Sequence, residues 1–115
     1  MTEVNQEQFL EQQIRTGKLL RQLGVPVHRA GYKQLCVALP CFARDDTQML
    51  TKELYPQVAA YFGNTDRRNV EHSIRTAIED AWQHRDPDVW EDYFPRCEKA
   101  PTNKRFLSTL VEFLQ

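Results

Sequence analysis

The sequence predicts an all-α domain, a compact bundle of six or seven short helices that contains a helix-turn-helix unit. Apolar residues recur at spacings of three and four along most of the chain, as on one face of a helix. No segment alternates apolar and polar residues as a strand does, and no Asn-Gly or Asp-Gly hairpin turn occurs. A length of 115 residues is that of one domain.

Two helices are expected before residue 45. The first covers about 6–23 and ends at Gly24 and Pro26. The second covers about 31–44, and Pro40 should kink it or end it early because proline lacks the backbone donor that the helix needs. The apolar residues that mark these helices are Phe9, Leu10, Ile14, Leu19, Leu20 and Leu23 in the first, and Tyr32, Leu35, Cys36, Leu39 and Phe42 in the second.

The middle of the chain contains the best-defined helix. A helical stretch over about 47–62 is split by Pro56, since proline suits the first turn of a new helix. After a short polar break, a long helix covers about 67–85, and Asp66 or Thr65 can cap its first amides. The inward residues are Leu50, Leu54, Val58, Ala59 and Phe62, then Val70, Ile74, Ala77, Ile78, Ala81 and Trp82.

Two short helices are expected to complete the bundle. Asp86 caps the first of them, Pro87 occupies its first turn and Pro95 closes it. Residues 101–103 then lead a last helix to the C-terminus. The inward residues are Val89, Trp90, Tyr93 and Phe94, then Phe106, Leu107, Leu110, Val111 and Leu114.

Composition limits the class of protein. Hydrophobic residues make up 41% and charged residues 27%, an ordinary globular mixture. No apolar run approaches the roughly 20 residues of a membrane helix, and no export signal begins the chain, so we expect a cytoplasmic protein without a membrane partner. The net charge of −1 excludes a global basic field, so any binding of nucleic acid must depend on a local basic surface.

Residues 56–85 predict the helix-turn-helix. Ala59 allows the first helix to approach the second closely, and Gly63 can leave the helix with a positive φ. Val58 and Phe62 should then pack under the turn, against the apolar face of the long helix.

The opposite face of the long helix is polar and carries the functional prediction. Placed N-terminus first in a major groove, such a face offers donors to guanine and an acceptor to cytosine, and Arg67 is placed for a phosphate. The alternative is an ordinary solvated face with an ion pair between Glu71 and Arg75. The residues of this face are Arg68, Glu71, His72, Arg75 and Glu79.

Four separated motifs, in order, resemble one family closely. They read LGVPVH at 23–28 with GY at 31–32, LYPQVA at 54–59, VEHSIRTAIEDAW at 70–82 and PTN at 101–103. The family is the C-terminal effector domain of the stage-zero sporulation response regulator, the transcription factor that starts endospore formation in Gram-positive bacteria. The resemblance assigns residues 14–115 to this domain and leaves 1–13 as an extension that begins the first helix.

The resemblance implies a transcription regulator that binds double-stranded DNA at short tandem promoter sites. It also implies contact with RNA polymerase through the helix near 86–94, and a homodimer on DNA through the last helix, 103–114. Family members normally carry a receiver domain before the effector domain. The residues that precede the matched region are too few for a receiver.

The predicted DNA-binding residues depart in part from the family pattern. Glu71 and Arg75 keep the family's residue types, whereas Asn69 and His72 stand where the family has arginine. The turn is also one residue longer, which moves Arg68 toward the position that Asn69 nominally fills. We therefore expect a shifted target sequence, with the contacts made by Arg67, Arg68, Asn69, Glu71, His72 and Arg75. Lys52, Lys99, Lys104 and Arg105 are expected on the same side as these arginines.

Two other classes of function compete with DNA binding. For an enzyme or a metal site, the three histidines and three cysteines are scattered without a known motif, so we expect no catalytic residue, no metal and no cofactor. The alternative function is a degenerate effector domain that acts as a protein-interaction module. Trp90, Tyr93 and Phe94 would then be exposed anchors for a partner rather than core residues.

Overall fold

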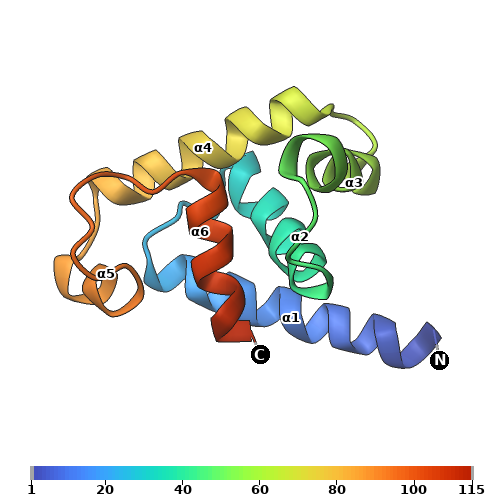
Figure 1. The fold of residues 1–115 in the computed structure, drawn as a ribbon, viewed down its shortest axis with the longest axis horizontal. Helices are drawn as coiled ribbons and strands as arrows, with labels where there is room; N and C mark the ends of the chain where they lie inside the picture. Colours follow the sequence, from blue (N-terminus) through green and yellow to red (C-terminus); the bar gives the residue numbers. More distant parts are fainter. Residues whose placement is uncertain (1, 115) are drawn as a thin grey trace.

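The computed structural model describes residues 2–114, and every element in this range is helical, as predicted. Figure 1 shows the helices wound around a common core. In chain order they are α1 (Thr2–Gln22), α2 (Ala30–Arg44), a π-helical turn η1 (Leu50–Leu54), α3 (Tyr55–Phe62), α4 (Arg67–Gln83), α5 (Pro87–Tyr93), α6 (Asn103–Leu110) and a 3₁₀ turn η2 (Val111–Leu114).

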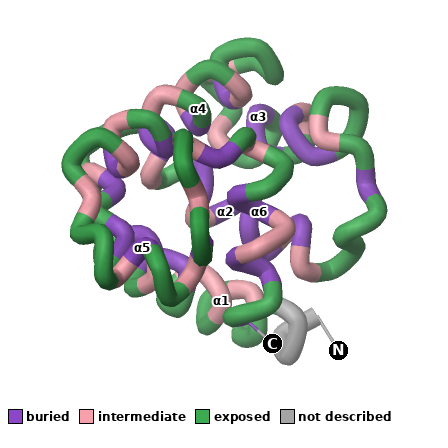
Figure 2. The backbone as a smooth tube through the Cα atoms, turned by 60° about the vertical axis from the view of Figure 1, so that its left-hand side comes forward, coloured by how far each residue is buried: buried purple, intermediate pink, exposed green. Residues whose placement is uncertain are grey.

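Helix α2 lies at the centre of the fold. It packs against α1 on one side and α4 on the other, and α6 with η2 covers it as well. Figure 2 shows the buried segments of the chain gathered on the inner sides of the helices, with the connecting loops exposed. Every predicted inward residue of the last helix is buried, and so is the predicted α4 stripe except Trp82, which is half-buried against the core. Within residues 2–114, no helix combines the length and the hydropathy needed to cross a lipid bilayer.

An aromatic cluster joins α5 to α6. Trp90 and Phe94 are each only 2% exposed, and their rings lie 5.1 Å apart. The Phe94 ring stacks on that of Phe106 at 5.5 Å, and the Trp90 indole N–H donates a hydrogen bond to the Leu23 carbonyl at 2.9 Å. Trp90 and Phe94 are therefore core residues, and the interpretation of these two as exposed partner anchors is wrong. Tyr93 is half-buried.

The N-terminal half agrees with the prediction at α2 and differs from it in α1. Helix α2 continues to Arg44, in agreement with the predicted range of about 31–44, so of the two alternatives at Pro40 the early end is wrong. Leu39 and Phe42 on either side of the proline are buried, and this tertiary packing holds the last turn despite the missing hydrogen bond. Leu10 and Ile14 help to mark the first helix in sequence, yet in α1 they are 57% and 54% exposed.

The third helical stretch begins later than expected, at Leu50 rather than near residue 47. The cause is the buried Gln48 side chain, which donates hydrogen bonds to the carbonyls of Cys41 at 3.0 Å and Asp45 at 2.9 Å. These carbonyls lie at the end of α2, where the backbone has no partner further along the helix. Pro56 stands in the first turn of α3, as predicted.

Helices α2 and α4 lie very close together at Gly31. A Cβ added there would lie 2.7 Å from the Cβ of Ala77 and closer still to the Ser73 carbonyl oxygen. Both contacts belong to the α4 backbone or to an atom directly attached to it, so neither can move without moving the helix. Only glycine allows this distance between the two helices.

The Gly31→Ala variant is expected to lower the free energy of unfolding by about 1–3 kcal/mol, because α4 must shift to admit the methyl group. Urea denaturation measures the difference. The matched control is Gly17→Ala in α1, where the added Cβ would meet only the ends of the Tyr32 and Arg21 side chains, which can rotate away. An equal loss of stability in both variants would contradict the argument.

Candidate nucleic-acid interface

The predicted turn between α3 and α4 is present. Gly63 ends α3 in the left-handed conformation with φ +79°, and its amide donates to the Ala59 carbonyl at 2.9 Å. Asp66 caps α4 by accepting a hydrogen bond from the Asn69 amide at 2.9 Å. The two helices pack together through Val58 and the buried α4 stripe. Residues 55–83 thus form a helix-turn-helix with α4 as its second helix.

The six predicted DNA-binding residues all lie in the first half of α4. None of them belongs to the buried stripe, because Val70, Ile74 and Ala77 occupy the opposite side of the helix and are fully buried. Glu71 is half-buried, and the exposed members of the set are Arg67, Arg68, Asn69, His72 and Arg75.

One ion pair lies on this exposed face. The Arg75 guanidinium donates to the Glu71 carboxylate at 3.4 Å, and both side chains remain partly exposed. Exposed pairs at this spacing contribute only about 0.3–0.5 kcal/mol, so another partner can replace Glu71 at little cost. Among the described residues, Arg67 and Arg68 form no ion pair.

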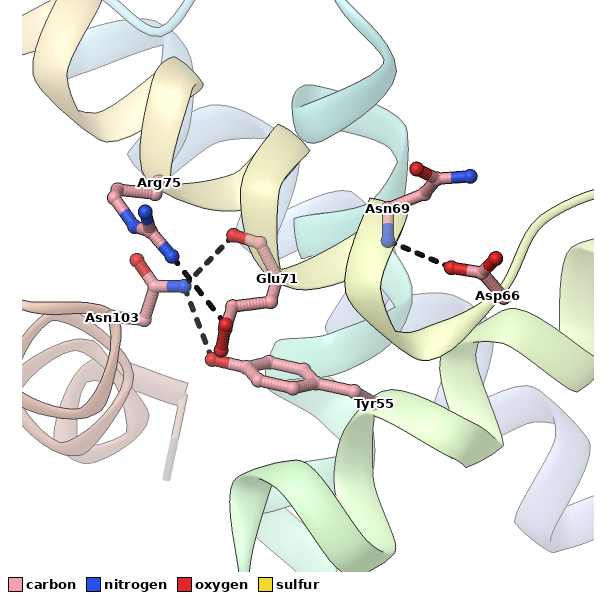
Figure 3. A network of polar contacts seen from close by, with 6 residues as sticks. All are labelled: Tyr55, Asp66, Asn69, Glu71, Arg75 and Asn103. Carbon is pink, nitrogen blue, oxygen red and sulfur yellow. Dashed lines mark hydrogen bonds and ion pairs between the residues drawn. The ribbon is translucent and has the colours of Figure 1, made fainter.

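A polar network fixes α4 relative to α3 and α6 (Figure 3). The Asn103 side-chain amide donates to the Tyr55 hydroxyl at 3.0 Å and to the Glu71 backbone carbonyl at 3.1 Å. Burial raises the pKa of Tyr55, so its hydroxyl stays neutral in this network at physiological pH. The roles of Tyr55 and Asn103 could not be predicted from the sequence, because their partners are far away along the chain.

The start of α6 extends the polar surface beside α4. Thr102 caps α6 by accepting a hydrogen bond from the Arg105 amide at 3.1 Å. A hollow lies between this end of α6, the η1 turn and the middle of α4, and it is lined by Thr51, Arg75, Asn103 and Lys104 among others. Lys104 therefore joins Arg75 on one surface, whereas the common side for Lys52, Lys99 and Arg105 stays a prediction.

A second contact holds α4 from the α2 side. The Arg29 side chain, at the start of α2, donates to the Asp80 carboxylate at 2.9 Å. The other carboxylate oxygen of Asp80 lies 3.1 Å from Nδ1 of His84. The Arg29–Asp80 ion pair holds α4 on the side of α2, and the Asn103 hydrogen bond to the Glu71 carbonyl holds it on the side of α6. These contacts leave the polar face of α4 uncovered.

The cysteines lie apart from this face and are partly buried against the core. Burial raises the pKa of Cys36 to about 11 and also raises that of Cys41, so both remain thiols near neutral pH. Within the described part of the chain, no group of three or more histidine, cysteine or acidic side chains has a geometry suited to a metal ion.

Comparison with protein-family models gives one match over residues 16–114. The matching family is described as "Sporulation initiation factor Spo0A C terminal". The matched range includes the whole helix-turn-helix, both flanking contacts and the aromatic cluster.

Proposed function

The chain belongs to the family of the Spo0A C-terminal domain, a family of DNA-binding effector domains of sporulation transcription factors, and from this premise we propose that it recognises a specific duplex sequence through α4. The observation that carries the proposal is the division of α4 into two sides. One side is locked in the core, and the other presents arginines that the fold leaves uncovered.

The proposed docking follows from the position of each side chain. Arg68 and Arg75 lie two turns apart on the exposed face and would donate to guanines in the major groove. Asn69 would pair with an adenine, which family members with arginine there would not do. Arg67, at the first position of the helix, would contact a phosphate near the helix N-terminus. The target would therefore differ from that of the family pattern.

Lys104 would add a further contact to the phosphate backbone of the DNA. It lies at the start of α6, beside the hollow that Arg75 also lines. Its ammonium lies 5.2 Å from the centroid of the Phe42 ring in α2, and the flexible side chain would extend from there to a phosphate when α4 is inside the groove. Phosphate contacts of this kind fix the orientation of a protein on DNA. Binding to chromosomal DNA would place the protein in the cytoplasm.

The protein partners proposed from the resemblance involve α5 and α6. Since Trp90 and Phe94 are buried, a contact of α5 with RNA polymerase would use its exposed acidic residues, Asp88, Glu91 and Asp92. The apolar stripe of α6 and η2 is likewise buried in the core. A dimer on tandem sites through this segment would therefore use the outer side, where Phe113 is 46% exposed.

Selection of bound duplexes from a random pool tests the proposed function. We expect enrichment of one motif, and an affinity that falls with salt in proportion to the number of phosphates neutralised. A pool that shows salt-dependent binding but no enriched motif would reject sequence-specific recognition. A pool without any binding would reject α4 as a DNA-binding surface in this chain.

The Arg75→Ala variant is expected to weaken binding to the selected motif by about 5- to 150-fold, because a two-pronged arginine–guanine contact contributes about 1–3 kcal/mol. Fluorescence anisotropy with a labelled duplex measures the change. The matched control is Arg44→Ala, which removes an exposed arginine at the other end of the fold, where its guanidinium lies over the Phe9 ring of α1. Equal losses in both variants would indicate only a general charge effect.

A further inference from the structure

Helix α1 carries an exposed apolar pair that the core does not use. Leu10 and Ile14 lie one turn apart on the same side of the helix and are both more than half exposed. Glu7 precedes them by about one turn and Lys18 follows by about one turn, on nearly the same line along the helix, and both are exposed. Glu7, Leu10, Ile14 and Lys18 are called here the α1 stripe.

Several other residues of α1 already contact the rest of the chain. Leu20 is fully buried, and Arg21 donates to the Tyr32 hydroxyl at 2.8 Å. Arg15 donates to the Leu114 carbonyl at 3.1 Å, which ties the helix to η2. Within the described residues, neither Glu7 nor Lys18 forms an ion pair. The α1 stripe therefore has two apolar side chains at its centre. At its ends it has two charged side chains that form no ion pair with any described residue.

The charges along α1 are segregated. All charged residues before position 15 are glutamates, and all those from 15 to 22 are basic. This order favours the helix itself, because negative charge at the N-terminus and positive charge at the C-terminus complement its dipole. The dipole gives no reason, however, for two large aliphatic side chains to face water between the two charges.

We propose that the α1 stripe pairs with the α1 stripe of a second copy of this chain, the two helices running antiparallel. In this arrangement Leu10 of each copy packs on Ile14 of the other, and Glu7 of each copy faces Lys18 of the other. Both pairings fit one register to within one residue, since the residue numbers add to 24 for Leu10 with Ile14 and to 25 for Glu7 with Lys18. A parallel pair would place Glu7 against Glu7 and Lys18 against Lys18.

The contact is small and isologous, so its size predicts a weak and reversible dimer. The charges at its ends decide orientation and partner choice more than total affinity. A two-fold pair of this kind leaves α4 free, because α1 and α4 lie on opposite sides of α2 (Figure 1).

Charge exchange gives a direct test. In the full-length chain, Glu7→Lys alone should place two lysines at each end of the dimer, and Lys18→Glu alone should place two glutamates there. Each single variant should therefore show a dimer dissociation constant about tenfold higher than the natural sequence at low salt. An equimolar mixture of the two variants restores both attractive pairs and should form mixed dimers about as stable as the natural ones. Sedimentation equilibrium over a wide range of protein concentration measures all three.

Two further measurements complete the test. The double variant Leu10→Ser with Ile14→Ser should lose self-association while keeping the helical circular dichroism spectrum, since both side chains are exposed. Val27→Ser, which removes an exposed aliphatic side chain in the loop before α2, is the matched control and should leave the dimer unchanged. The proposal is overturned if the natural chain stays monomeric, if the mixed variants do not associate better than each alone, or if Val27→Ser lowers self-association as much as the double serine variant does.

Discussion

Replacing Ile74 by alanine is expected to lower the free energy of unfolding by about 2–5 kcal/mol. Ile74 is fully buried on the inner side of α4, where the side chains of the core surround it on all sides. Removal of three carbons leaves a cavity between α4 and the helices beneath it, and well-packed interiors collapse only partly around such cavities. Urea denaturation followed by circular dichroism measures the loss.

The neighbouring residue provides the control for this variant. Arg75→Ala removes only an exposed ion pair and should change the free energy of unfolding by less than about 0.5 kcal/mol. Under conditions where both variants are folded, Ile74→Ala should bind the selected duplex almost normally, whereas Arg75→Ala should not. If Ile74→Ala left stability unchanged, or if Arg75→Ala unfolded the domain, the assignment of the two faces of α4 would be wrong.

Replacing Trp90 by alanine is expected to lower the free energy of unfolding by about 3–5 kcal/mol. The indole lies among the rings of Trp82, Phe94 and Phe106, at centroid distances of 5.4, 5.1 and 6.3 Å. The substitution also removes the only side-chain donor to the Leu23 carbonyl among the described residues, and an unpaired buried acceptor adds to the cost. Thermal unfolding and tryptophan fluorescence report both changes.

Two substitutions separate packing from hydrogen bonding at this position. Trp90→Phe retains most of the ring contacts and should lose less stability than Trp90→Ala. Trp82→Ala is the second comparison, because Trp82 is only half-buried and the Arg85 guanidinium, 3.7 Å from its ring centroid, covers one side. If Trp82→Ala were more destabilising than Trp90→Ala, Trp90 would not be the centre of the aromatic cluster.

The helices could be predicted from the sequence because their signals are local. The spacing of Val70, Ile74 and Ala77 identifies the buried side of α4, and Asp66 and Asp86 act as caps in the structure as their positions predict. The features that could not be predicted depend on tertiary contacts. The choice between the alternatives at Pro40 and the delayed start of η1 at Leu50 both depend on packing around the end of α2, the second through the buried Gln48.

The candidate site also has one part that could be predicted from the sequence and one part that could not. Exposure of Arg68 and Arg75 follows from the helical period once the buried stripe is known, so their location on the polar face could be predicted. The supports of that face could not, since Asn103 lies 32 residues from Glu71 and Arg29 lies 51 residues from Asp80. No local pattern records contacts between residues so far apart along the chain.

Under the proposed function, the glycine at position 31 limits how the domain could come to bind a different DNA sequence. Because the α2 and α4 backbones lie so close at this point, a movement of α4 toward α2 would bring the two backbones into contact. New binding preferences would therefore arise more readily by exchange of individual side chains at positions such as 68, 69, 72 and 75 than by a change in how α4 packs. Under the proposed function, substitutions transplanted between domains with the same glycine should therefore carry their base preferences with them.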